Sequence, residues 1–173
     1  MSNILIAYFS HKGKNYVSGN IVNLTVGNTT IAAEKIANQT GGNMIEIIPQ
    51  KDYPFEYAPC TEVAKVELRQ NARPTLQNSI DITNYDTIIL GFPNWWGTMP
   101  MPVWTFLENG DFTGKTIVPF CTNEGSGMGV SVNDIKKLCP FSKIMEGLAI
   151  TGSRVAFADK DIAKWLKNSN VIS

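Results

Sequence analysis

Short apolar runs alternate with amphipathic segments along almost the whole chain. The runs cover residues 4–9, 44–48, 87–92 and 116–121, and a fifth lies within 143–150. Apolar runs this short are typical of strands that a parallel sheet buries on both faces. Because a helix crosses between two parallel strands, the alternation predicts an α/β fold: a doubly wound sheet of five parallel strands with helices on both faces.

Helices are expected between these runs, around residues 31–37, 61–70, 103–107, 132–138 and 162–166. Pro102 suits the first turn of the third helix, and Asp159 is expected to cap the last. We expect the second helix to turn Val63 and Val66 toward the sheet. Pro119 lies inside the fourth strand, and because it has no N–H to donate, it predicts a local irregularity there.

Length and charge narrow the class of protein. The 173 residues predict one domain, residues 1–173, which can bury a core without disulfides. Fifteen basic and fifteen acidic residues cancel, so no net field attracts nucleic acid or an anionic membrane. Neither is expected as a partner, and the first apolar run is too short to cross a membrane.

The cysteines indicate a reducing compartment. Cys60, Cys121 and Cys139 are widely spaced and lack the paired spacing of a zinc site. We therefore expect reduced thiols in a cytoplasmic protein that holds no metal. Cys121 is interpreted as a packing residue rather than a redox group.

The loop after the third strand, residues 91–100, holds two adjacent tryptophans among two glycines and two prolines. Ligands of open α/β sheets bind outside the carboxyl ends of the strands, where this loop begins. Trp95 and Trp96 therefore form either a platform for a flat aromatic ligand or a hydrophobic plug at the sheet edge.

The loop after the first strand begins at Ser10 and ends in Gly27, directly before a helix. Small polar side chains and free N–H groups at a helix N-terminus suit a phosphate group. The same residues could simply cap the helix. The chain has neither the P-loop nor the dinucleotide-binding glycine pattern, which excludes those two kinds of nucleotide site.

The loop after the fourth strand, residues 121–129, is rich in glycine and hydroxyl groups. Glycine lets the backbone approach a ligand closely, so this loop could bind the polar edge of a planar ring, or it could be a flexible connection. A flat heterocycle with one phosphate would satisfy all three loops together.

These motifs resemble those of the flavodoxin family, over nearly the whole chain. Ser10 with residues 27–29 is similar to the phosphate loop of the family, and residues 93–97 resemble its flavin-stacking loop. Residues 121–127 resemble the loop that binds the pyrimidine edge of the flavin. The resemblance implies a flavodoxin-like sheet with strand order 2-1-3-4-5.

The resemblance also implies noncovalently bound FMN, with the indole of Trp96 stacked on the ring and the backbone of Gly97 near its N5 atom. The implied phosphate contacts are Ser10, His11, Gly27, Asn28, Thr29 and Thr30. The implied ring contacts are Pro93, Asn94, Trp95, Trp96, Gly97, Cys121, Thr122, Asn123, Glu124, Gly125, Ser126 and Gly127.

The implied function is transfer of electrons through FMN to a redox partner protein or a small-molecule acceptor. An alternative is an FMN-dependent NAD(P)H reductase that acts on a quinone or another small acceptor. The neutral charge and a fourth loop without an aromatic favour the reductase, whereas the family resemblance favours the carrier. A signalling receiver is disfavoured because Ser10 and Asn94 stand where it needs acids, and a cofactor-free interaction module is a further alternative.

Residues 11–26 depart from the family pattern as a long insertion in the phosphate loop. A loop of this length in a small domain is usually functional or mobile. His11, the only histidine, either assists a phosphate or a proton transfer or lies exposed to solvent in this loop; we expect the exposed position.

Overall fold

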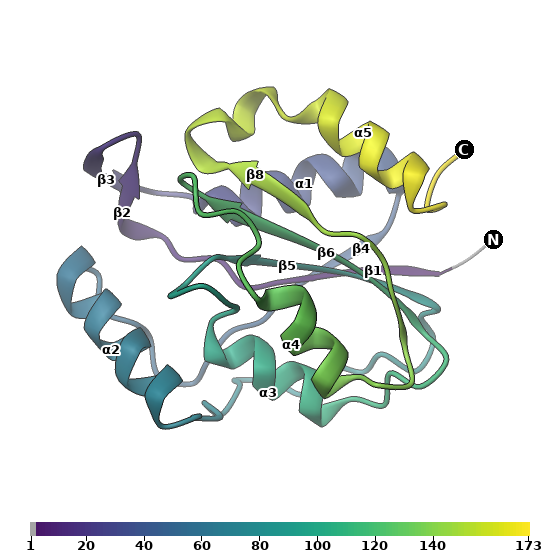
Figure 1. Cartoon of the computed structure of the whole chain (residues 1–173), viewed down its shortest axis with the longest axis horizontal. Coiled ribbons are helices and arrows are strands. Elements are labelled where there is room, and N and C mark those ends of the chain that lie inside the picture. Colours follow the sequence, from purple (N-terminus) through teal and green to yellow (C-terminus); the bar gives the residue numbers. More distant parts are fainter. Residues whose placement is uncertain (1–2) are drawn as a thin grey trace.

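The structure is a computed structural model that describes residues 3–173. Parallel strands form its main sheet in the order β4 (Asn43–Glu46), β1 (Ile4–Tyr8), β5 (Thr87–Pro93) and β6 (Thr116–Asn123). Two short strands, β7 (Lys143–Ile144) and β8 (Leu148–Thr151), both pair with the outer side of β6. This order is the predicted 2-1-3-4-5, so the doubly wound α/β fold is confirmed (Figure 1).

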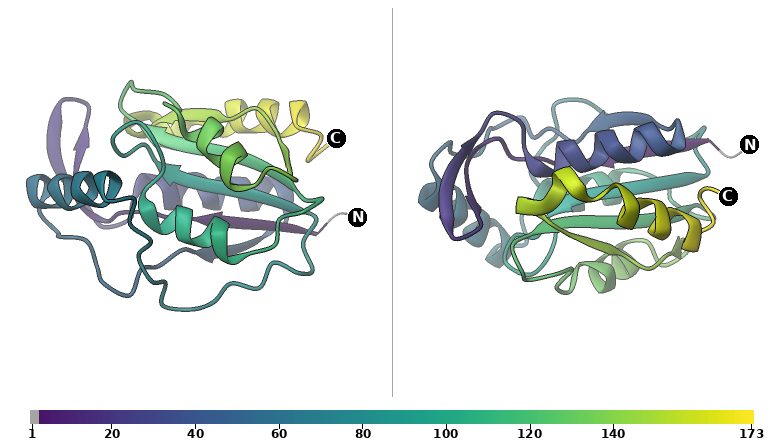
Figure 2. Two further views of the ribbon diagram at one scale, coloured as in Figure 1. Left: turned by 60° about the horizontal axis from the view of Figure 1, so that its bottom comes forward. Right: turned by 90° about the horizontal axis from the view of Figure 1, so that it is seen from above.

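Helices cover both faces of the sheet (Figure 2). On one face lie α1 (Asn28–Thr40) and α5 (Asp159–Asn168), and on the other lie α3 (Met101–Asn109) and α4 (Ser131–Leu138). Successive strand residues point to opposite faces. Accordingly, Ile6 and Ile89 join the core under α1 and α5, while Leu5 and Leu90 join the core under α3 and α4.

The helix boundaries follow the predicted periodicity with small shifts. Pro102 lies in the first turn of α3, and Ile162, Trp165 and Leu166 are buried on α5, as expected. Asp159 does not cap α5, because it is already the first helical residue and its carboxylate binds Lys35 Nζ at 2.8 Å. The expected capping of this helix by Asp159 was therefore wrong.

The irregularity predicted at Pro119 is a break in the edge of the sheet. Strand β6 pairs with β7 only at Thr116 and Ile117 and with β8 only from Phe120 onward. Met145 N donates to Ile117 O, and in a strand alternate residues point to the same neighbour. The backbone nitrogen of Pro119 therefore faces the side of β7 and β8. Because it has no N–H to donate there, the edge of the sheet is divided into these two short strands.

The second expected helix is present as α2 (Tyr57–Arg69), but its orientation differs from the prediction. Val63 and Val66 are exposed, and Cys60 and Ala64 form the buried face instead. The main neighbours of α2 are the inserted segment and α3, because the helix stands beside the carboxyl ends of the strands rather than flat on the sheet (Figure 1).

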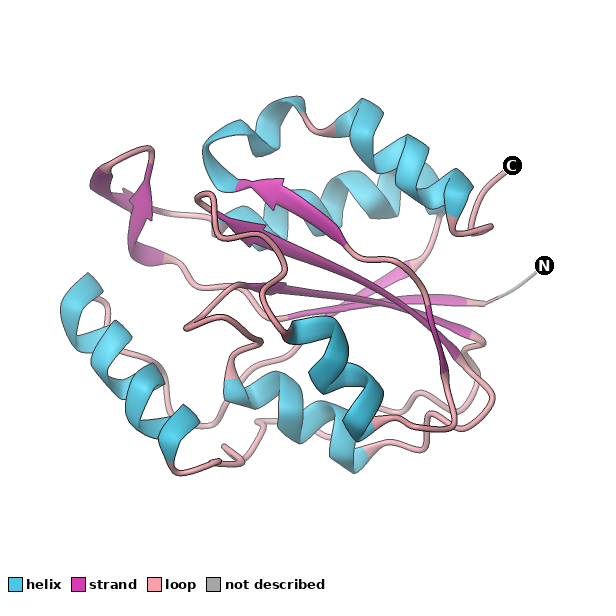
Figure 3. Ribbon diagram, in the orientation of Figure 1, coloured by secondary structure: helices cyan, strands magenta, loops and turns pink. Residues whose placement is uncertain are grey.

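The insertion after β1 forms an antiparallel hairpin of β2 (Gly13–Val17) and β3 (Asn20–Leu24). Its two-residue turn places Ser18 and Gly19 at positive φ, as the right-handed twist of a hairpin requires. Figure 3 shows this hairpin and α2 at the same end of the molecule. A short 3₁₀ helix, η1 (Gly152–Phe157), follows β8. In the described residues, every helix is too short or too polar to span a membrane.

Candidate functional site

A cavity of about 450 Å³ opens at the carboxyl ends of the parallel strands. We call its inner side the strand-end wall; it consists of Asn28, Thr29, Pro93, Asn94, Trp95, Trp96, Thr122, Asn123, Glu124, Ser126 and Gly152. We call its other side the outer wall; it consists of Lys14, Asn15 and Tyr16 from β2 and Tyr57, Cys60, Thr61 and Ala64 from α2. His11 also lines the cavity.

The N-terminus of α1 opens into this cavity. Gly27 is the N-cap, and no side chain caps the helix from that position. A Cβ at Gly27 would collide with Ser10 Oγ, which itself accepts a hydrogen bond from Thr30 N at 3.2 Å. Asn28 and the buried Thr29 then face the cavity at the positive end of the helix dipole. This helix start can therefore accept an anion.

The two tryptophans have different environments. Trp95 packs edge-on against Phe9 and Tyr53, with ring centroids 5.2 and 4.9 Å away. Trp96 is 51% exposed, and its Nε1 donates to Thr61 O at 2.9 Å. Trp95 therefore anchors the loop in the core, whereas the half-exposed indole of Trp96 extends toward α2.

The tryptophan loop turns through two residues at positive φ, Trp96 and Gly97. Trp95 N donates to Thr98 O at 2.9 Å and closes the turn. Val130 N donates to Gly97 O at 2.7 Å, and a Cβ at Gly129 would collide with that same oxygen. Gly129 is thus required for the two loops to approach, whereas Gly97 is favoured by its positive φ alone.

Two asparagines order the loops of the strand-end wall, Asn94 by joining two loops and Asn123 from within its own loop. Asn94 accepts a hydrogen bond from Gly97 N at 2.9 Å and donates to Gly127 O at 2.7 Å. Asn123 Oδ1 accepts from Gly125 N at 2.8 Å and from Gly127 N at 3.1 Å. The strand-end wall is therefore ordered by its own hydrogen bonds.

Glu124 connects the strand-end wall with the hairpin. Its Oε1 accepts a hydrogen bond from Ser153 N at 2.9 Å, at the start of η1. Its Oε2 accepts from Ser18 N at the hairpin tip, at 3.4 Å. The second bond is long, so the tip of the hairpin is held only weakly.

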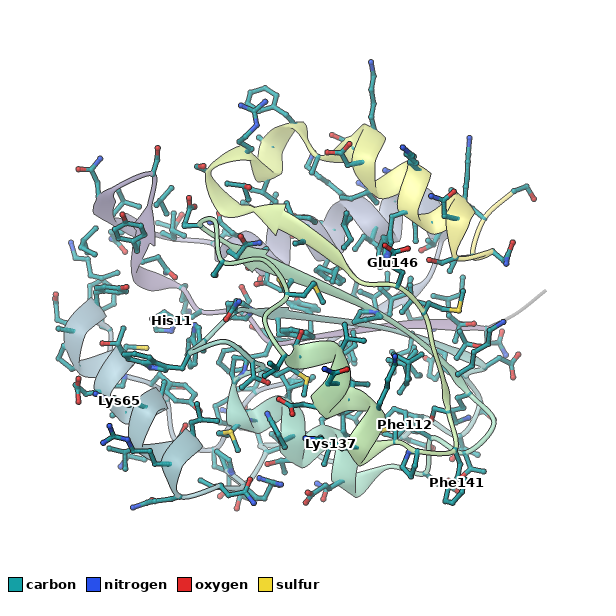
Figure 4. All side chains as sticks on the ribbon, in the orientation of Figure 1. His11, Lys65, Phe112, Lys137, Phe141 and Glu146 are labelled. Carbon is teal, nitrogen blue, oxygen red and sulfur yellow. The ribbon has the colours of Figure 1, made fainter. Side chains whose placement is uncertain are left out.

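His11 is not the solvent-exposed loop histidine that we expected. Its ring lies edge-on to Trp95 at 5.8 Å, and its Nε2 atom is buried without a hydrogen-bond partner. Burial lowers the pKa of His11, so the imidazole is neutral at physiological pH. Figure 4 shows His11 near the strand ends and Lys65 on α2.

The two cysteines near the cavity, Cys60 and Cys121, are free thiols that the packing of the protein buries. Cys121 is buried, its Sγ donates to Gly127 O at 3.2 Å, and burial raises its pKa to about 12. Cys60 lines the outer wall, and burial raises its pKa to about 11. Across residues 3–173, no three His, Cys, Asp or Glu side chains gather in a way that could hold a metal ion.

The structure brings most of the residues proposed from the sequence together around the cavity. Those that line it are His11, Asn28, Thr29, Pro93, Asn94, Trp95, Trp96, Thr122, Asn123, Glu124 and Ser126. Ser10, Gly27, Thr30, Gly97, Cys121, Gly125 and Gly127 do not line it but shape or support its loops. Sequence reasoning missed the outer wall and Gly152, although the Ser-Gly pair at 18–19, flanked by apolar residues, indicates a turn.

Comparisons with known proteins agree with this geometry. A family model described as Flavodoxin matches residues 3–169. A structure from Bacteroides eggerthii, described as a candidate flavoprotein, has a TM-score of 0.76 and 29% identity, covering 99% of this chain and 100% of its own. A flavoprotein from Lactobacillus acidophilus solved with FMN has a TM-score of 0.66 and 22% identity, covering 91% and 98%. Oxidised Flavodoxin 2 from Bacillus cereus has a TM-score of 0.51 and 19% identity, covering 96% and 99%. No curated protein matches the chain.

Proposed function

The chain belongs to the flavodoxin family, and from that premise we propose that it binds FMN noncovalently in the cavity and transfers electrons through it. One observation carries the proposal: the start of α1, where Asn28 and Thr29 line the cavity, and the exposed indole of Trp96 open into the same cavity. These are the two surfaces that a phosphate and a flat ring require.

The phosphate would bind at the start of α1. The backbone N–H groups of Asn28 and Thr29, the side-chain amide of Asn28 and the hydroxyl of Ser10 would supply hydrogen-bond donors there. Thr30 N already donates to Ser10 Oγ and so holds that hydroxyl at the start of the helix. The helix dipole adds a favourable interaction with the negative charge. Gly27 keeps this cradle intact, because a side chain there would displace Ser10 Oγ.

The ring would stack on Trp96 and contact the loop after β6. Stacking contributes about 0.5–1.5 kcal/mol beyond the burial of apolar area. Thr122, Asn123 and Ser126 line the cavity beside the tryptophan and would bind the polar edge of the ring. When bound, FMN supplies one- and two-electron chemistry, and the protein adjusts its electronics through these contacts.

A reductase that acts on a small acceptor is the second candidate function. The outer wall favours it, because β2 and α2 extend the cavity beyond the loops assigned to FMN. A carrier would deliver its electrons to a redox partner protein instead. All three cysteines are buried and free, which suits the cytoplasm that we propose as the site of action.

Titration with FMN tests the cofactor assignment. Apo-protein is titrated with FMN, and binding is followed by flavin fluorescence and the visible absorption bands. The variant Asn28→Asp adds a negative charge at the start of α1, so it should weaken FMN binding about tenfold. The same charge should stabilise the apo-protein by about 0.5 kcal/mol, because a negative charge at a helix N-terminus interacts favourably with the helix dipole.

Asn38→Asp is the matched control, since it adds the same charge at an exposed position near the other end of α1. It should leave FMN affinity unchanged. If wild-type protein leaves the FMN spectrum and fluorescence unaltered, the proposed function is wrong. If Asn28→Asp binds FMN as wild type does, the phosphate is not at this helix.

A further inference from the structure

The outer wall carries an aromatic pair that the proposed FMN contacts do not use. Tyr16 of β2 and Tyr57 of α2 both line the cavity, and their rings are stacked with centroids 6.4 Å apart and planes 28° apart. Tyr16 is 47% exposed. Trp96 extends from the other wall and bonds to α2 at Thr61. Three aromatic side chains therefore border this part of the cavity.

The backbone holds the aromatic pair in place. Lys14 N donates to Phe55 O at 3.0 Å, two residues before α2 begins. Gly13 approaches Phe55 so closely that an added Cβ would lie 3.0 Å from its ring. The base of the hairpin and the start of α2 are thus joined, and the two tyrosines belong to one structural unit.

The outer wall also carries the positive charge of the cavity. Lys14 is the only lysine or arginine among the lining residues of the described chain, and Glu124 is the only acid among them. The Glu124 oxygens already accept hydrogen bonds from Ser153 N and Ser18 N. On the rim, Lys65 Nζ lies 5.4 Å from the centroid of the Trp96 ring. A ligand at this wall meets aromatic faces and a cation.

We propose that the outer wall binds the second substrate: a flat, electron-poor aromatic carbonyl compound of the quinone class that carries a negative charge. The electron-rich faces of Tyr16 and Tyr57 favour stacking with an electron-poor ring, and Lys14 pairs with the charge. This assignment rests on the proposed function, because the electrons reach the acceptor from FMN.

The reaction balances with a two-electron donor such as a reduced nicotinamide. The donor gives two electrons and a proton to the oxidised cofactor and leaves in its oxidised form. The quinone then takes two electrons from the reduced cofactor and two protons overall, one of them from solvent. It leaves as a hydroquinone, and the cofactor returns to its oxidised state.

Binding to the oxidised, FMN-loaded protein tests the proposal without turnover. Calorimetric titration compares 1,4-naphthoquinone-2-sulfonate with uncharged 1,4-naphthoquinone, and the sulfonate should bind more tightly. Lys14→Gln should abolish that preference. Tyr16→Leu should weaken binding of both quinones about fivefold, as expected for the loss of one aromatic contact, while the Kd for FMN stays unchanged.

Two control variants lie on the same segment. Lys12→Gln removes an exposed lysine that does not line the cavity, and Ile21→Ala alters the cross-strand partner of Tyr16. Both should keep the wild-type affinity and preference for the sulfonate. Thermal unfolding of every variant reports whether the hairpin changes have disturbed the fold.

The outcomes separate this proposal from the proposed function. If wild-type protein does not bind FMN, the proposed function fails. If FMN binds but both quinones bind equally, or Lys14→Gln and Tyr16→Leu bind them as wild type does, only the quinone subsite is overturned. If Tyr16→Leu weakens FMN binding rather than quinone binding, the outer wall belongs to the cofactor site and the proposal is also overturned.

Discussion

The two walls of the cavity are built in different ways. The strand-end wall follows buried strands, and its loops bond to one another through Asn94 and the Val130–Gly97 contact. The outer wall joins the strand-end wall through side-chain hydrogen bonds such as the 2.9 Å bond from Trp96 Nε1 to Thr61 O and the 3.4 Å bond between Ser18 and Glu124. A rigid wall suits a cofactor that stays bound, whereas a loosely attached wall suits a ligand that enters and leaves.

The largest difference between the walls should appear when a glycine is replaced in each. Gly129→Ala places a Cβ against Gly97 O and requires a left-handed backbone, so it should lower the free energy of unfolding by about 4 kcal/mol. Gly19→Ala at the hairpin turn also requires positive φ but meets nothing within 4 Å, and should cost about 1 kcal/mol. Urea unfolding measures both, and equal losses would contradict the comparison.

The next largest effect should separate the two tryptophans. Trp95→Ala removes the packing against Phe9 and Tyr53 and should lower the free energy of unfolding by about 3 kcal/mol. Trp96→Ala should cost about 1 kcal/mol or less, since that side chain is half-exposed. It should instead weaken FMN binding. A large stability loss with Trp96→Ala would show that this residue supports the fold as Trp95 does.

A smaller, pH-dependent effect should come from His11. Because burial lowers its pKa below the ordinary value of 6.5, the unfolded chain binds this proton more readily than the folded one. Neutral His11 therefore makes its full contribution to the free energy of unfolding above pH 6.5. That contribution declines as the pH falls from 6.5 toward the lowered pKa of the folded state. In His11→Gln, the part of the pH dependence of the free energy of unfolding that comes from this histidine should be absent. Unfolding by urea across pH 5–8 measures it, and identical slopes in the two proteins would contradict the prediction.

The smallest effect should come from the connection between the walls. Glu124→Gln keeps an oxygen that can accept from Ser153 N but loses the second oxygen, which accepts from Ser18 N. The loss should be about 0.5 kcal/mol. Amide hydrogen exchange should accelerate in β2 and β3 while β5 and β6 stay protected. Faster exchange throughout the sheet would show that the hairpin is not an independent unit.

The sequence predicted the strand-end wall far better than the outer wall, for a physical reason. Buried strands such as β5 need continuous apolar runs, so their ends, and the loops that follow, can be located from local residues alone. The side of α2 that is buried depends on what packs against it. Val63 and Val66 suggested one face, but α2 buries Cys60 and Ala64 instead, and its main neighbours are β2 and α3.

The hairpin was not predicted from the sequence, for a different reason. Its Ser18-Gly19 turn, flanked by apolar residues, is a local signal that was readable in the sequence. The interior position of His11 was not, because it depends on Trp95, which is far away along the chain. Local patterns thus predicted elements, while tertiary contacts decided which side chains they expose.

The division of the sheet margin at Pro119 has a consequence for self-association. Strand β7 has two residues and β8 has four, so a neighbouring molecule that docks along this margin meets only brief stretches of free backbone amides. Long, flat margins are the ones that recruit further chains into fibres. A proline in β6, the strand next to this margin, therefore leaves only short lengths of free backbone on this side of the sheet.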